Sequence, residues 1–94
     1  MVKVIVQHHV VDYDRWFPLF TEHQAVRVSH GATGHSVNRA VSDPNTLVIV
    51  NDFATLEGAM AFTKDPSLPA AMERGGVDGA PQVWIVEEAD AASY

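Results

Sequence analysis

Five histidines give this 94-residue chain its clearest chemical signal: His8, His9, His23, His30 and His35. The chain has no cysteine, which excludes disulfides, a thiolate nucleophile and sites in which cysteine holds zinc or an iron–sulfur cluster. Histidine titrates near neutral pH and can act as a general base or as a metal ligand. Whether the five act together depends on the elements that carry them.

Hydrophobic periodicity predicts one α+β domain spanning residues 1–94, with elements in the order β-α-β-β-α-β. Strands are expected at 2–11, 33–41, 46–52 and 81–87. A long helix is expected from Tyr13 to about His30, and a second helical region after Thr55 continues in a short helix from Pro66 to Gly75. Residues 42–45 have the composition of a turn, and 88–94 form a polar tail. This order is the ferredoxin-like pattern, a four-stranded antiparallel sheet with helices on one face.

The face of the sheet that lacks helices leads to a second prediction. The strands at 2–11, 46–52 and 81–87 carry apolar side chains on both sides, so the uncovered face would expose apolar surface to water. A small domain also buries only part of its apolar surface by itself. A homodimer in which two sheets pack face to face is therefore expected.

Several stretches of the sequence carry a family resemblance that covers most of the chain: VQHHVVDYDRW (6–16), DPN (43–45), VIVNDF (48–53), LEGAMAF (56–62), DPSL (65–68) and AMERGGV (71–77). They resemble small dimeric α/β-barrel proteins of the ferredoxin-like superfamily. That superfamily includes antibiotic-biosynthesis-monooxygenase-like proteins, polyketide cyclases, muconolactone isomerases and haem-degrading oxygenases. The resemblance implies a homodimer and a small cavity between each subunit's sheet and helices. For the monooxygenase branch it also implies that no metal, flavin or haem is needed.

His8 and His23 are the first candidates for chemistry. His8 shares a strand face with valines, where burial would favour the neutral, basic form of the imidazole. His23 lies on the inner stripe of the long helix with Trp16 and Phe20, from which it could face the first strand. For each, the alternative is a structural histidine with a satisfied hydrogen bond.

The sequence gives weaker support for a chemical role of the other three histidines. His35 shares a strand face with Arg39, and the pair could bind an anion or a carbonyl, or simply meet solvent. His30, in the last turn of the helix, is expected to complement the helix dipole. His9 points away from His8 and is expected to face the partner sheet or the rim.

The spacing of the histidines argues against a metal site. His8 and His9 point to opposite faces of a strand, and His23 and His30 would stand roughly 10 Å apart along a helix. A metal site would need His8, His23 and His35 to converge over long range, and haem would need a large pocket. We therefore expect no metal and no cofactor.

These observations predict a cofactor-independent enzyme that acts on a small apolar or aromatic, polyketide-like molecule by oxygenation, cyclisation or isomerisation. His8 or His23 would remove a proton, and Arg39 with His35 or Asn51 would stabilise the resulting oxyanion. Trp16, Tyr13 and Phe20 are the expected substrate-binding aromatics. The alternative is a non-catalytic dimeric module that binds a small ligand or only assembles.

The charge and hydropathy of the chain limit the classes of partner that it is expected to bind. The net charge is −6, with 12 acidic and 6 basic residues and no basic cluster, so nucleic-acid binding is not expected. No apolar run approaches the roughly 20 residues that cross a bilayer. A cytoplasmic protein without a membrane partner is the expectation.

Overall fold

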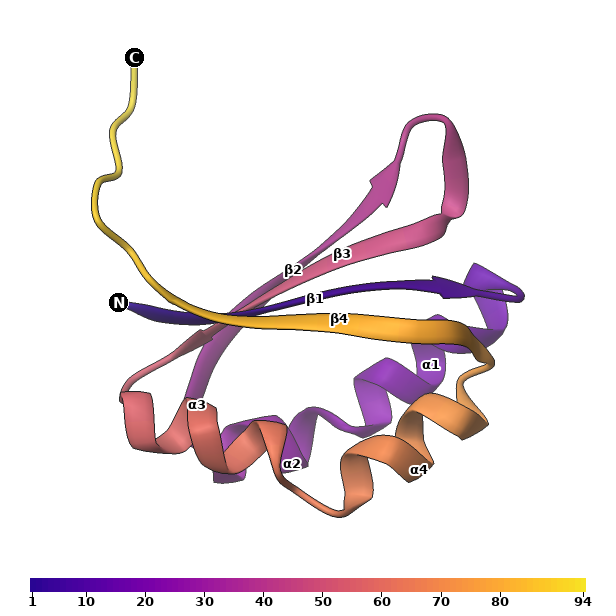
Figure 1. Ribbon diagram of the computed structural model, residues 1–94, viewed down its shortest axis with the longest axis horizontal. Coiled ribbons are helices and arrows are strands. Elements are labelled where there is room, and N and C mark those ends of the chain that lie inside the picture. The colour runs from indigo at the N-terminus through magenta and orange to yellow at the C-terminus, as the bar shows by residue number, and fades with distance from the viewer.

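The computed structural model describes residues 1–94 as a four-stranded antiparallel sheet with helices on one face (Figure 1). The strands lie in the order β2-β3-β1-β4. In chain order the elements are β1 (Val2–Val10), α1 (Tyr13–Glu22), α2 (Gln24–Ser29), β2 (Ala32–Ala40), β3 (Asp43–Phe53), α3 (Leu56–Thr63), α4 (Ser67–Arg74) and β4 (Val77–Glu87). This is the predicted ferredoxin-like α+β arrangement. No helix has the length and apolar character needed to cross a membrane.

The core lies between the helices and the two central strands. Along β1, the side chains of Val4, Val6, His8 and Val10 are buried, because the pleat turns every second residue toward the helices. The same alternation on β3 buries Leu47, Ile49, Asn51 and Phe53. The helices contribute Trp16, Ala59 and Phe62.

The long helix predicted from Tyr13 to His30 is two helices. It breaks at His23, whose ψ of −1° ends α1 before α2 begins. No glycine or proline stands at the break, so the local sequence does not mark it. The side chain of His23 bonds Ser67 at the start of α4, 44 residues away, and a contact of this range leaves no trace in helical periodicity.

Two strands begin earlier than predicted. Asp43 of the predicted turn opens β3, where it pairs with Ala40 and its carboxylate accepts hydrogen bonds from Asn45 N and Thr46 Oγ1. β4 begins at Val77 rather than residue 81, and its pairing with β1 is irregular between Gln7 and His9. Gly79 lies in this stretch with a φ of +76°, a conformation that favours glycine.

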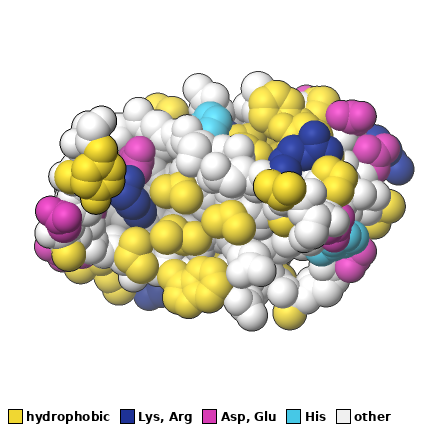
Figure 2. All heavy atoms as spheres, turned by 90° about the horizontal axis from the view of Figure 1, so that it is seen from above, with side chains coloured by type: hydrophobic (Ala, Val, Ile, Leu, Met, Phe, Trp, Pro, Cys, Tyr) yellow, Lys and Arg dark blue, Asp and Glu magenta, His cyan; other side chains and the backbone are white.

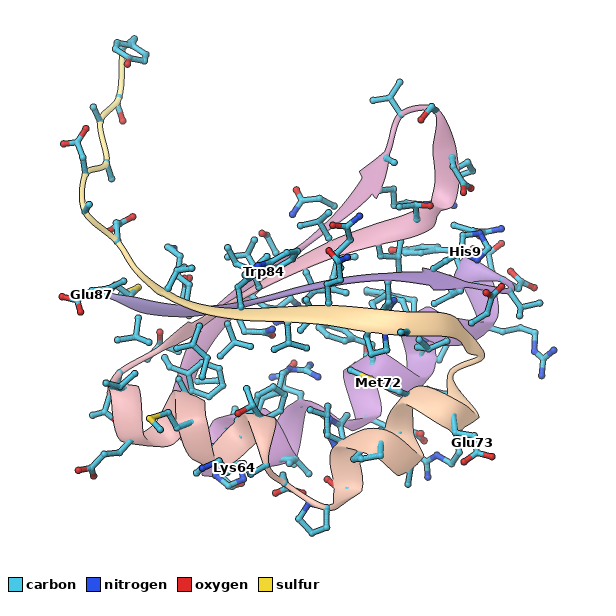
Figure 3. All side chains as sticks on the ribbon, viewed as in Figure 1. His9, Lys64, Met72, Glu73, Trp84 and Glu87 are labelled. Carbon is cyan, nitrogen blue, oxygen red and sulfur yellow. The ribbon has the colours of Figure 1, made fainter.

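The sheet face opposite the helices is partly apolar. Cross-strand pairing places Ile5 beside Trp84 and Val50, and Lys3 beside Val86 and Asp52. Hydrophobic side chains extend across the middle of this face when the molecule is seen from above (Figure 2). Trp84 points to this side of the sheet (Figure 3) and is 44% exposed. Residues 88–94 extend away from the body as an exposed tail.

Candidate active site

A cavity lies between the sheet and all four helices. It leaves about 60 Å³ for the centres of water molecules. Nine of its thirteen lining residues are hydrophobic, and the polar ones are His8, His23, Arg27 and Asn51. The full lining is Val6, His8, Trp16, Leu19, Phe20, His23, Arg27, Ile49, Asn51, Phe62, Leu68, Ala71 and Met72. An apolar cavity with a few polar groups on its wall is typical of a small-molecule site.

The wall formed by α1 is aromatic. The rings of Trp16 and Phe20 stack with their centroids 4.9 Å apart. Gly75, at the end of α4, makes room for the indole, since a Cβ there would lie 2.9 Å from Trp16 Cδ1. On the opposite side Met72 reaches from α4 toward the sheet (Figure 3). The cavity therefore offers a flat surface suited to an aromatic ring.

His8 lies on β1, in the middle of the sheet. Its side chain meets the edge of Trp16, with ring centroids 5.8 Å apart, and the residue is 7% exposed. Its Nδ1 is buried and has no hydrogen-bond partner. Burial lowers the pKa of His8 below its usual 6.5, so the imidazole is neutral at neutral pH.

His23 also lines the cavity, and a hydrogen-bonded chain holds its ring. Its Nε2 lies 3.0 Å from Ser67 Oγ, which donates to Asp65 Oδ1 at 2.6 Å. His30 Nε2 lies 2.7 Å from the other oxygen of Asp65. The hydrogen bonds from His30 and Ser67 hold the pKa of Asp65 well below its usual range.

This series of hydrogen bonds determines the tautomer of His23. The Ser67 hydroxyl proton goes to the ionised Asp65, so Ser67 Oγ can only accept from His23. In the neutral ring Nε2 then carries the proton and Nδ1 is the basic nitrogen. Burial, with the nearby Arg27 as a lesser cause, lowers the pKa of His23.

Asn51 on β3 is 2% exposed. Its Nδ2 donates to the carbonyl of Val4 at 3.2 Å, whereas its Oδ1 is buried without a partner. A buried acceptor without a donor is unfavourable unless a water or a ligand supplies one.

Arg27 on α2 is the polar residue of the cavity that the sequence analysis missed. It is 3% exposed, and its guanidinium carbon lies 3.8 Å from the centroid of the Phe20 ring. The spacing of Arg27 could have predicted its place in the cavity, because it follows Phe20 by seven residues and His23 by four on the inner stripe. Arginine is seldom buried, so a search for polar residues at apolar positions would have been needed to find it.

Three of the predicted site residues lie outside the cavity. Arg39 is held over the ring of Tyr13 at 3.9 Å, and its Nε donates to the carbonyl of Pro44 at 2.8 Å. Tyr13 lies beyond Trp16, with the two rings tilted and their centroids 5.8 Å apart. His35 contacts the outer side of the Phe20 ring edge-on. Burial lowers the pKa of His35. The structure thus brings together His8, His23, Asn51, Trp16 and Phe20, but not Arg39, Tyr13 or His35.

The side chains of the two remaining histidines contact carboxylates away from the cavity lining. His9 lies on the open face of the sheet, 3.0 Å from Asp78 and 3.4 Å from Asp43. His30, which was expected to complement the helix dipole, has its Nε2 2.7 Å from Asp65 Oδ2. No group of three or more His, Cys, Asp or Glu side chains is arranged to hold a metal ion.

Sequence comparisons do not identify the chain. No protein-family model matches it, and no curated protein is significantly similar to it.

Solved structures with the same fold are, by contrast, numerous. SnoaB from Streptomyces nogalater, described as a cofactor-independent oxygenase, superposes with a TM-score of 0.77 and is 11% identical, over 96% of this chain and 94% of that chain. A protein named "putative antibiotic biosynthesis monooxygenase" from Bordetella bronchiseptica gives 0.74 and 15% identity, over 93% and 95% of the two chains. Its counterpart from Deinococcus radiodurans gives 0.72 and 17%, over 100% and 98%. At these identities the likeness concerns the fold, and the chain has the ferredoxin-like fold of the antibiotic biosynthesis monooxygenase structures.

Proposed function

We propose that the cavity is the active site of a cofactor-independent enzyme in which His8 removes a proton from a small aromatic molecule. The observation that carries this proposal is the buried Nδ1 of His8, which has no protein partner and belongs to a lining residue of an apolar cavity. A general base must be deprotonated at the working pH and free to reach the substrate. His8 is neutral at neutral pH and its Nδ1 has no protein partner, whereas the ring of His23 is held in place by its hydrogen bond to Ser67.

The chemistry starts from a neutral base and a neutral, weakly acidic O–H or C–H group. The lone pair of His8 takes the proton, which leaves an imidazolium on the protein and an anion on the substrate. The aromatic wall of Trp16 and Phe20 holds the ring and excludes water, which strengthens electrostatic interactions inside the cavity. An electron-rich anion of this kind can react with dioxygen, close a ring or rearrange. The fold shared with SnoaB, described as a cofactor-independent oxygenase, makes oxygenation the first reaction to test.

The test is oxygen uptake with a panel of mono- and polycyclic phenols in buffer that contains a chelator and no added cofactor. We expect at least one phenol to consume oxygen at a rate proportional to enzyme concentration. Binding without any oxygen uptake or product would favour the non-catalytic ligand-binding module instead. Turnover that appears only with added metal or flavin would contradict the cofactor-independent mechanism.

The pH dependence of the reaction follows from the state of His8. Because burial lowers its pKa below 6.5, its basic form persists into mildly acidic solution. We expect kcat/KM to be constant from pH 8 to about 6.5 and to fall only below that value, since protonation of His8 removes the base. A kcat/KM profile measured with an active phenol checks this. A midpoint above 6.5 would contradict the assignment of a buried base.

We also propose that two chains pair through the open faces of their sheets. The support is the apolar surface formed by Ile5, Val48, Val50, Trp84 and Val86, which no helix of the same chain covers. Trp84, on β4, is 44% exposed in the isolated chain. A second copy would remove this surface from water.

Replacing Trp84 with lysine is expected to convert a dimer into a monomer at micromolar concentration. The substitution places a charge in the middle of the apolar surface, where a second sheet would desolvate it. Light scattering coupled to size-exclusion chromatography measures the mass of each variant. Leu56→Lys, at an exposed position on α3, is the matched control and should remain dimeric. A monomeric wild type, or an unchanged mass for Trp84→Lys, would contradict the proposed interface.

A further inference from the structure

We infer that the cavity binds its ligand as an anion, with the guanidinium of Arg27 holding the ionised oxygen of a single-ring aromatic acid. The inference rests on the proposed function because it names the ligand class of the same cavity. It concerns a residue that the proton transfer to His8 does not itself require.

Arg27 is a buried cation without a counter-ion. It has no carboxylate within ion-pair distance, unlike Lys3, His9 and His30, and its Nη2 has no hydrogen-bond partner. Acidic residues are not scarce, since the chain has 12 of them against 6 basic residues. The absence of a carboxylate beside Arg27 is therefore a feature of this place in the fold, and it leaves room for an anion from outside.

An uncompensated buried charge is strongly unfavourable for folding. Burial lowers the pKa of Arg27 only to about 10, so the side chain stays charged at neutral pH. The ring of Phe20 offsets part of this cost by a cation–π contact. That contact uses the face of the guanidinium, and leaves the N–H groups at its edge free to donate to an oxyanion.

Three buried polar atoms without hydrogen-bond partners indicate which polar groups the ligand carries. Besides Arg27 Nη2 they are His8 Nδ1 and Asn51 Oδ1, and all three residues line the cavity. Asn51 Oδ1 can only accept, so a water or an O–H or N–H group of the ligand can satisfy it. The ligand thus carries an anionic oxygen for Arg27 on an apolar body, with room for a polar substituent or a water at Asn51.

The size of the cavity limits the size of the apolar part of the ligand. The centre of a buried water needs roughly 10–15 Å³ of free space, so the 60 Å³ available corresponds to roughly four to six waters. This is the space of one aromatic ring with small substituents. Polycyclic molecules would have to displace Leu68 and Met72, which separate the cavity from an outer groove beside β4.

Two kinds of anion share this chemistry, a carboxylate and a phenolate. Isothermal titration of the wild-type protein at neutral pH with benzoate, 4-nitrophenol and the neutral benzamide separates them. We expect benzoate or 4-nitrophenol to bind about tenfold or more tightly than benzamide, because only an ionised oxygen forms charge-assisted hydrogen bonds with Arg27. Benzoate alone would identify a carboxylate site, and 4-nitrophenol alone a site for phenolate.

The variant Arg27→Met removes the charge and keeps much of the apolar stem. Anion binding should fall about tenfold or more, while benzamide binding stays the same. Replacing a buried, unpaired charge with an apolar side chain should also leave the thermal midpoint unchanged or raise it. A purely structural arginine would instead lower the midpoint on replacement. Arg39→Met, outside the cavity, is the control and should bind benzoate as the wild type does.

The outcomes distinguish this inference from the proposed function. If benzamide binds the wild type as tightly as benzoate and 4-nitrophenol do, or if Arg27→Met binds the anions unchanged, the anion site is wrong. Turnover that depends on His8 would then still support the enzyme. If none of the three probes binds and no phenol is turned over, both proposals fail.

Discussion

Replacing His8 with glutamine is expected to lower kcat/KM by about 10²–10⁴-fold, the usual contribution of a general base. Glutamine fills a similar volume and keeps a hydrogen-bonding end, but it cannot take up a proton. The loss should appear in kcat more than in KM, because the ring of the substrate still stacks against Trp16 and Phe20. Steady-state kinetics with any phenol that the wild type turns over measures both parameters.

His35→Gln is the matched control for this substitution. His35 is also a histidine on the helix-facing side of the sheet, but it lies on the outer side of Phe20 and does not line the cavity. Its replacement should change kcat/KM by less than about threefold, as expected for a residue without a part in proton transfer. Equal losses in the two variants would point to a general effect on folding. Unchanged turnover in His8→Gln would remove His8 as the base and leave His23 as the candidate.

Replacing Gly58 with alanine is expected to destabilise the protein by about 3 kcal/mol or more. A Cβ at Gly58 would lie 2.1 Å from the backbone oxygen of His30, so α3 would have to move away from the end of α2. Without that clash the change would stabilise the chain by roughly 0.5–1 kcal/mol, because Gly58 is inside a helix. A lower stability of Gly58→Ala would therefore indicate the clash, and a higher stability its absence. Urea denaturation gives the free energy of unfolding of both proteins.

Gly34→Ala provides the control for Gly58→Ala. A Cβ at Gly34 would meet only Asp52 Oδ2, at 3.8 Å, an ordinary contact. We expect its stability to stay within about 1 kcal/mol of the wild type. If Gly58→Ala proved as stable as Gly34→Ala, the close approach of α3 to His30 would be wrong. The placement of His30 against Asp65, and with it the orientation of His23, would then also be in doubt.

Periodicity was enough to place two of the predicted site residues on the faces that line the cavity. The alternation of valines along residues 2–10 put His8 on the buried face of β1, and the helical stripe of Trp16 and Phe20 included His23. Both side chains line the cavity. Such patterns are reliable because burial forces one face of each strand and helix to be apolar, so a polar residue on that face stands out.

Contacts between distant elements could not be read from the sequence. His23, at the break of the helix, bonds Ser67, 44 residues further along the chain, and the partner of His30 is Asp65, 35 residues further along. Arg39 was expected to stabilise an oxyanion because it shares a face with His35. In the structure Tyr13 and the Pro44 carbonyl hold it away from the cavity. Arg27 escaped notice because an arginine at a buried helical position is expected to be solvent-exposed, whatever its spacing.

The central claim is that this cavity takes a proton from an aromatic hydroxyl group. A spectrophotometric titration of 4-nitrophenol tests it most directly, because the phenol and the phenolate absorb at different wavelengths. We predict that the wild-type protein lowers the apparent pKa of the bound probe below its value in buffer, and that His8→Gln reduces this shift while His35→Gln does not. A probe that binds as the neutral phenol, or that ionises in the cavity as it does in water, would contradict the account.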